Sequence, residues 1–517
     1  MRALPLLPLL PLLFLPTGLL AQAPVIDSIA LETHNIYDSV QARSNLLAGL
    51  MNALHIRTRP WVVRRELLFD VGDRVDARRL EETERNLRRL GIFRDAHVDT
   101  VRVDDRLVAR VVTYDGWTTS LETALSFTGD VVTWSVGLNE RNVLGTGHLL
   151  GGNYRKEVDR DAWRVRAQLN RLFGSRATVA GFYDNLSDGQ AAAWNGGAPF
   201  RAMDDRFEVL LPGQVADRRV LRFRDGTVSD TLWRRALIQE ARFGWAPVAG
   251  PGGYLRVGVY GQARREQYLA IEDTALASPD SAFGVVGAWA ELFRPRFLEV
   301  THYNGFARRE DIDLGTRVTL GLSLAPPAFG YPRAGVVPAV GLQVGAGTPV
   351  AFARLRAAAH GLFTSEGLDS GQVWAGLTLA SRLVSRQATV VHVQGGVQEN
   401  PAPGAEFDLG HGRGPRAFAP HAFTGTRSIW GIAEHRVFLV DALFGLMGIG
   451  VAGFFDYGGA WFADQPRRLG GDVGLGLRTG ATSATGPNVG RLDLAYRFGD
   501  GLTGSRWVVS FGTAFEF

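Results

Sequence analysis

The sequence predicts a mainly β protein, a transmembrane antiparallel β-barrel of about sixteen strands preceded by a small α+β domain. Three observations predict this class: a secretory leader, a hydrophobic period of two from Trp117 onward, and an apolar last strand that ends on Phe517. About 400 residues follow Trp117, and roughly 25 residues for each strand and its connection give the expected strand number.

Residues 1–23 have the composition of a signal peptide. A positive start at Arg2 precedes a Leu-rich run, and Ala21-Gln22-Ala23 provides a small-residue exit. The run contains four prolines, which suit a membrane-spanning helix poorly. We expect cleavage after Ala21 or Ala23, and therefore an exported chain; the alternative is a retained anchor helix.

The composition narrows the possible functions. The absence of cysteine excludes thiol redox catalysis, disulfides and thiolate metal sites. The net charge is only +4 despite a pI near 9.5, so we assign the arginines to lumen and surface and expect no nucleic-acid partner. The ten histidines are scattered, and we expect no catalytic, metal-binding or cofactor-binding residues. A His/Ser pair that hydrolyses lipid in a barrel wall is the enzymatic alternative.

Residues 24–115 combine helical and strand periods. Leu46, Leu50 and Leu54 form an amphipathic stripe, which we expect to pack on its own domain; a membrane-surface role is the alternative. Asp76 can cap a helix that ends at Gly91. The expected elements are a strand over 25–31, helices over 44–54, 60–69 and 76–90, and a hairpin of 96–103 with 106–112 around Asp104-Asp105.

Residues 116–517 alternate between apolar and polar or small side chains. Clear examples are 163–169, 473–478 and 491–498. Alternation occurs both in soluble sandwiches and in membrane barrels, whose apolar side faces lipid. The leader and the terminal strand, Trp507 to Phe517, favour the barrel, and its eleven residues match a tilted membrane strand.

Several motifs resemble known families. A "G-D" turn, a helix and an "L-G-x-F" ending resemble a POTRA domain, and the region after that domain resembles the barrel of the BamA/TamA superfamily, also called bacterial surface antigens. The POTRA-like segments are 66–73, 80–87 and 90–94; the barrel motifs are 142–147, 414–418, 434–436, 454–461 and 491–496.

The resemblance implies a loop that folds back into the barrel. Arg416 would meet Glu434 and Asp456, with Phe418 in the same motif, and a guanidinium can bind a carboxylate through two hydrogen bonds. Losing one partner would cost about 3–5 kcal/mol in a dry lumen and about 1 kcal/mol in the wet lumen that we expect. Ala417 replaces the family's Gly, so Arg413 is an alternative loop arginine.

The resemblance also implies a lateral seam between the first strand, Trp117 to Phe127, and the last. Poor closure there would offer backbone groups to another strand. The implied role is insertion, assembly or translocation of other proteins in the bacterial outer membrane, with the first domain in the periplasm. The alternative is a passive pore or a two-partner secretion translocator. The seam candidates are Trp117, Phe127, Trp507, Phe511, Phe515 and Phe517. The expected partners are outer-membrane lipids, unfolded barrel clients or one secreted protein, and periplasmic chaperones or lipoproteins.

Overall fold

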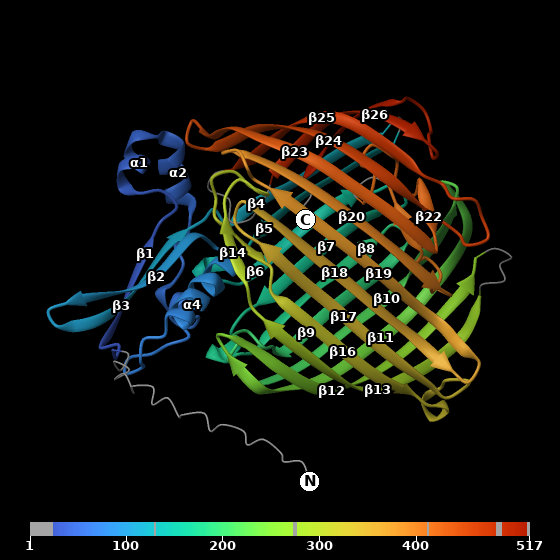
Figure 1. Cartoon of the computed structure of the whole chain (residues 1–517), viewed down its shortest axis with the longest axis horizontal. Helices are drawn as coiled ribbons and strands as arrows, with labels where there is room; N and C mark the ends of the chain where they lie inside the picture. The colour runs from blue at the N-terminus through green and yellow to red at the C-terminus, as the bar shows by residue number, and fades with distance from the viewer. Residues whose placement is uncertain (1–23, 129–130, 272–276, 411–412, 482–488, 514–517) are drawn as a thin grey trace, which may run out of the picture.

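The structure, a computed structural model, describes residues 24–513 except 129–130, 272–276, 411–412 and 482–488. The expected signal peptide, Phe515 and Phe517 lie outside the described residues. A small α/β unit stands at one end of a large barrel (Figure 1). We call that end of the barrel the near end and the opposite one the far end.

The α/β unit is a three-stranded sheet with helices. The strand order is β1-β3-β2, in which β1 is parallel to β3 and β2 is antiparallel to it. As predicted, Asp76 caps α4 by accepting a hydrogen bond of 2.9 Å from the Arg78 N–H. Asp104 and Asp105 turn the β2–β3 hairpin with φ of 45° and 63°. The elements are β1 (Ser28–His34), α1 (Ser39–Ser44), α2 (Leu46–Leu54), α3 (Pro60–Arg64), α4 (Ala77–Arg89), β2 (Phe93–Val103) and β3 (Arg106–Asp115).

The predicted packing of the leucine stripe on its own domain is wrong. Leu46, Leu50 and Leu54 are 89%, 53% and 66% exposed, and Ala48 is the buried residue of α2. The reason is that α1 and α2 form a hairpin beside the near rim of the barrel, away from the three-stranded sheet (Figure 1). The helix predicted over 60–69 is also shorter than expected, since α3 ends at Arg64.

Twenty strands follow one another in the closed order of the barrel, in the described part of the chain. The expected number of about sixteen is wrong because strand and connection together take about 20 residues, owing to tight hairpins. The first strand begins at Thr119, two residues later than predicted. The barrel strands are β4 (Thr119–Thr128), β5 (Val131–Glu140), β6 (Leu149–Lys156), β7 (Asp161–Leu169), β8 (Thr178–Leu186), β9 (Gly189–Ala198), β10 (Phe207–Arg224), β11 (Thr227–Gly250), β12 (Gly253–Ala270), β13 (Ser278–Arg294), β16 (Thr316–Ala325), β17 (Gly335–Gly347), β18 (Ala351–Thr364), β19 (Gly367–Ser381), β20 (Gln387–Glu399), β23 (Arg427–Leu443), β24 (Met447–Trp461), β25 (Gly470–Ala481), β26 (Val489–Gly499) and β27 (Trp507–Thr513).

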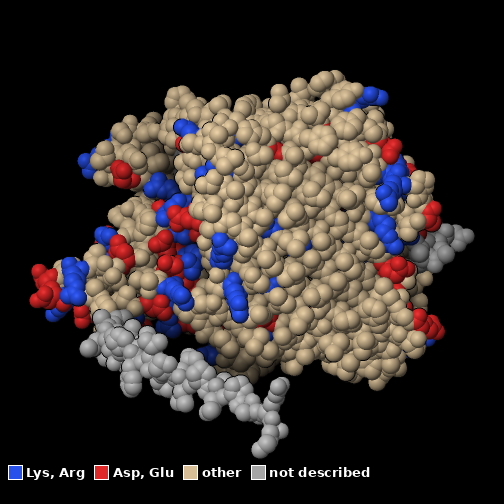
Figure 2. Space-filling view, in the orientation of Figure 1, with Lys and Arg blue, Asp and Glu red and all other residues tan. Residues whose placement is uncertain are grey.

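The barrel wall has an apolar outer face. Leu475 and Leu477 on β25 are 72% and 47% exposed, whereas Arg478, next along the strand, is 2% exposed in side chain. The visible wall carries few charged side chains, and these gather at its two ends (Figure 2). None of the helices in the described ranges has both the length and the apolar character needed to span a membrane.

Two connections fold inward and pack against the wall. The near-end segment, residues 297–315, contains β14 (Phe297–Val300) and β15 (Glu310–Asp313), and its Tyr303 packs on Phe352. The far-end loop, residues 400–426, contains β21 (Phe407–Leu409) and β22 (Phe423–Gly425). The far-end loop is the eighth connection at its end, not the sixth that the resemblance implied, because the barrel has four more strands than expected.

Backbone and side-chain bonds join the α/β unit to the near rim. The side chain of Asn142, in the β5–β6 turn, donates to Thr58 Oγ1 at 2.8 Å and accepts from the Gly147 N–H at 2.8 Å. Gly145 has φ of 74°, and a Cβ there would collide with the Arg57 carbonyl oxygen. The turn therefore requires glycine where the two parts of the molecule meet.

Candidate functional site: a buried ion cluster in the barrel

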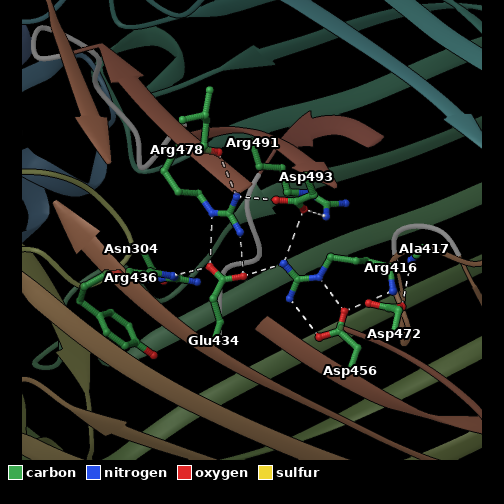
Figure 3. Close-up of polar contacts among 12 residues, drawn as sticks. Asn304, Arg416, Ala417, Glu434, Arg436, Asp456, Asp472, Arg478, Arg491 and Asp493 are labelled. Carbon is green, nitrogen blue, oxygen red and sulfur yellow. Dashed lines mark hydrogen bonds and ion pairs between the residues drawn. The ribbon is translucent and has the colours of Figure 1, made fainter. Parts of the chain in front are cut away.

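Arg416 carries the far-end loop into a pocket of carboxylates. Its Nε and Nη2 donate to the two carboxylate oxygens of Asp456 at 2.6 and 3.0 Å, and its Nη1 donates to Glu434 Oε2 at 2.6 Å (Figure 3). The guanidinium also lies 3.9 Å from the ring centre of Phe454. Two parallel bonds to one carboxylate fix the orientation of the arginine as well as its position.

Glu434 is the centre of the cluster. Besides Arg416, it accepts hydrogen bonds from Arg436 Nε at 2.8 Å and from Arg478 Nη2 at 3.0 Å. Arg478 also donates to Asp493 at 2.6 Å, and Asp493 accepts from Arg491 at 2.7 Å. One carboxylate therefore holds three guanidinium groups together.

The cluster is dry. The side chains that carry its ion pairs are 0–3% exposed. The expected wet lumen is therefore wrong at this level of the barrel, because the loop itself covers the pairs and excludes water. Removing a single partner should therefore cost about 3–5 kcal/mol, as for buried ion pairs in general. The cluster consists of Arg416, Arg436, Arg478 and Arg491 with Glu434, Asp456, Asp472 and Asp493.

Strand parity explains why these side chains point inward. On β24, Phe455 and Tyr457 are 47% and 42% exposed, whereas Asp456 between them is fully buried. Glu434 and Arg436 share one face of β23, as Arg491 and Asp493 do on β26. Since β23 to β26 are consecutive neighbours in the barrel, their inward charges meet.

The rest of the loop motif packs close to the cluster. The Ala417 N–H donates to Asp472 at 3.1 Å, and Phe418 is fully buried in an apolar cluster with Phe423 and Trp430. Ala417 does not have a positive φ, so the departure from glycine causes no strain; the positive φ, 92°, belongs to Gly414. Arg413 is exposed and pairs through its backbone with Gly410, so Arg416 is the arginine that reaches the carboxylates.

The structure separates the predicted seam residues. Trp507 and Phe511 lie on β27 with 60% and 37% of their surface exposed, and Phe127 lies on β4. Trp117 precedes β4 and packs instead against the cluster of Ile36, Tyr37 and Ala48. The placement of Trp117 in the first strand is therefore wrong. The two seam strands themselves are neighbours in the barrel order.

Sequence reasoning missed five of the eight residues of the cluster and the cluster's link to the near end. It did not select Arg436, Arg478, Arg491, Asp472 or Asp493 as site residues, although all five have inward parity on consecutive strands. Arg436 Nη1 also donates to the Tyr303 carbonyl at 2.6 Å, which joins the near-end segment to the cluster. That contact pairs residues 133 positions apart, and no local pattern predicts it.

A second polar cavity, of about 900 Å³, lies between α4, the near-end segment and the barrel strands β12, β13, β16 and β18. Ten arginines and five carboxylates line it. Arg88, on α4, lines the cavity and donates to both carboxylate oxygens of Asp311 on β15 at 2.9–3.1 Å. The excess of arginine gives the near mouth of the barrel a positive field that attracts anions.

His421 ties the far-end loop to the β6–β7 turn. Its ring bonds Asp408 at 2.6 Å and Asp159 at 2.9 Å and stacks on Phe223. Burial alone would lower the pKa of His421, but the two carboxylates raise it to about 9. The charged form is therefore stabilised in the folded state.

We expect this tie to depend on pH. Because the folded pKa is raised, its contribution is complete below about pH 6.5, the ordinary histidine value, and is lost as the pH rises through about 9. NMR titration of histidine in the folded protein should show one signal with a midpoint near 9, which disappears in His421→Gln and moves down in Asp408→Asn. A His421 midpoint near 6.5 would mean that the carboxylates do not hold the ring.

The fold and the site define a class: a closed antiparallel β-barrel with an α/β unit at one end and an inward loop held by a buried ion cluster. Neither a known protein-family model nor a curated protein sequence matches the chain.

Three solved structures have a similar fold. They are BamA from Haemophilus ducreyi lacking POTRA domains 1–3 (12% identity, 93% of this chain and 84% of that one, TM-score 0.40), CdiB from Escherichia coli (9%, 96% and 91%, 0.49) and the FrpB iron transporter from Neisseria meningitidis (7%, 94% and 91%, 0.41). Identities and TM-scores this low carry no inference about function.

Proposed function

We propose that this chain is a bacterial outer-membrane barrel of the BamA/TamA type that assists the insertion, assembly or translocation of other proteins. In this proposal residues 24–115 are a POTRA-like domain in the periplasm, and residues 116–517 are the barrel. The observation that carries it is the contact of Arg416 with Glu434 and Asp456, which brings three of the family-like motifs together at one point. The role requires no catalytic residue, metal or cofactor.

The buried cluster argues against a permanently open pore. A wide aqueous channel would hydrate inward charges, whereas these are dry and covered by the far-end loop. The lateral seam is then the route for a client. β27 and β4 are neighbours in the barrel order, so the seam joins the first and last described strands of the barrel. Unpaired backbone groups at such an edge can template a client strand.

The experiment that tests the assembly role is a reversible lock of the seam. A cysteine at Leu121 or Leu125 of β4 is paired in turn with one at Trp507, Val509 or Phe511 of β27, and the pair that crosslinks is used, because these outward side chains lie on neighbouring strands. Oxidised cells should insert this barrel normally but lose client barrels from the outer membrane, and reduction should restore them.

The matched control is Val437→Cys with Val451→Cys, which are Cα partners across β23 and β24. That lock should leave client levels unchanged, because neighbouring strands of a continuous sheet need not separate. Unchanged client levels in the seam-locked cells, or after depletion of the protein, would remove the assembly role.

A translocator for one secreted protein is the second candidate. It is favoured by the way in which two inward segments meet: Arg436 bonds both Glu434 and the Tyr303 carbonyl, so the far-end loop and the near-end segment contact one cluster. Non-covalent contacts of this kind can open together. A disulfide that pins the far-end loop to the wall would block export of a secreted partner through the lumen and would spare assembly at the seam. The proposed partners are otherwise outer-membrane lipids and periplasmic chaperones or lipoproteins.

A further inference from the structure

The α1–α2 hairpin presents an uncharged apolar surface. α2 consists of nine residues without a charged side chain, and Leu46, Leu47, Leu50 and Leu54 are each at least half exposed. On α1, Val40 is 74% exposed. A contiguous apolar surface of this kind is unusual in contact with water and marks a site that binds a protein or a membrane.

The hairpin is fixed to the near rim of the barrel. Ile36, Tyr37 and Ala48 form a buried cluster, and Trp117 and Leu446 pack against it. Leu446 belongs to the near-end turn between β23 and β24, and Figure 1 shows the hairpin beside that turn. One side of the hairpin therefore packs against the barrel rim, and the exposed leucines lie on the other side.

The exposed leucines continue the apolar wall of the barrel. In the same near-end turn Phe444 is 83% exposed, and Met447, the first residue of β24, is 41% exposed. The wall beyond them carries few charges (Figure 2). Met447 and the hairpin lie at the same rim, so the medium around Met447 also surrounds the exposed leucines. For the proposed barrel that medium is lipid.

We infer that the α1–α2 hairpin is an interfacial membrane anchor, with Leu46, Leu50 and Leu54 inserted at the boundary between headgroups and acyl chains of the near leaflet. An apolar helix face that lies in the plane of this boundary buries its side chains without crossing the bilayer. Arg43 in the last turn of α1 supplies a charge that can meet lipid phosphate.

The anchor lies close to the near end of the lateral seam. The chain runs from the hairpin's partner Trp117 into β4, which begins at Thr119. An inserted helix displaces lipid locally, so it would loosen lipid packing where β4 meets β27. The anchor itself requires only that the barrel lies in a membrane, and it does not depend on the client-binding role.

The test uses the lack of native cysteine in the chain. A single Leu50→Cys variant of the full-length protein, labelled with an environment-sensitive fluorophore and reconstituted into phosphatidylethanolamine/phosphatidylglycerol vesicles, should show blue-shifted, enhanced emission. A lipid carrying a quencher near the headgroup should quench it more strongly than one carrying a quencher near the chain terminus, because the predicted depth is shallow.

Two matched labels calibrate the measurement. Leu475→Cys, 72% exposed on the wall, should be quenched best by the deep quencher; Arg106→Cys, exposed at the tip of the β2–β3 hairpin, should be quenched by neither lipid. If the Leu475 label fails to report lipid, the barrel is not inserted and the membrane assignment itself is wrong. If the Leu475 label succeeds while the Leu50 label behaves like the Arg106 label, the anchor is wrong.

A second copy of the chain is the competing occupant of the leucine face. In that case the Leu50 emission would shift only at high protein-to-lipid ratios and would resist both lipid quenchers. Leu46→Gln combined with Leu54→Gln should return the Leu50 label toward the emission of the Arg106 label. Equal heat-modified gel mobility of the variant and its parent will show that the barrel remains folded.

Discussion

Arg416→Ala should free the far-end loop and destabilise the folded barrel by about 3–5 kcal/mol, the cost of breaking a buried ion pair. Asp456 would lose both of its guanidinium hydrogen bonds and remain in a dry site. Glu434 would be affected less, because Arg436 and Arg478 still bind it. Thermal unfolding of the detergent-solubilised protein, followed by the loss of heat-modified gel mobility, measures the change.

Two further variants distinguish the loss of the lock from a general defect. Arg416→Lys keeps the charge but cannot form the two-pronged contact, so it should lie between wild type and alanine. Arg413→Ala changes an exposed loop arginine three residues away and should unfold like wild type. Equal unfolding temperatures for Arg416→Ala and Arg413→Ala would mean that Arg416 contributes nothing to the fold.

Glu434→Gln should be at least as damaging, because it removes the charge shared by three arginines. Arg416, Arg436 and Arg478 would then face each other with one fewer carboxylate in a site that excludes water. We expect a loss of about 3–5 kcal/mol in unfolding free energy and a larger ion conductance in planar bilayers as the far-end loop detaches.

Charge balance offers an internal check on this result. Adding Arg478→Gln to Glu434→Gln restores the net charge that the cluster has in the parent protein, so the double variant should be less destabilised than the sum of the two single variants. Glu399→Gln is the matched control, since Glu399 is half exposed and lies 3.9 Å from Arg427. Strict additivity of the two cluster variants would indicate that they do not belong to one network.

Much of the fold could be predicted because the period of two is a local property. Alternation along β25 and β26 identifies the outward leucines and the inward charges without any knowledge of their neighbours. The number of strands could not be predicted, because it depends on the lengths of the hairpin turns. Alternation also does not show where one strand ends: a long strand such as β11, with 24 residues, has the same pattern as two short strands.

The site could be predicted only in part, for a similar reason. The motif resemblance selected Arg416, Glu434 and Asp456, and the structure brings these three together. The remaining arginines and carboxylates come from strands whose register sets which charges meet, and the contact of Arg436 with Tyr303 depends on how the near-end segment folds. The dryness of the cluster is a property of the packed loop and has no signature in the sequence.

The most direct measurement of loop closure is disulfide formation between the far-end loop and the wall in intact membranes. Ala417 and Ala495 belong to one buried cluster with Phe454 and Val508, and the chain has no other cysteine to interfere when both alanines are replaced by cysteine. Oxidation should yield a single internally crosslinked species, which runs faster than the reduced chain on a denaturing gel. If the Val437→Cys, Val451→Cys pair crosslinks under the same conditions and the Ala417→Cys, Ala495→Cys pair does not, the loop does not lie in the barrel and the ion cluster described here does not form.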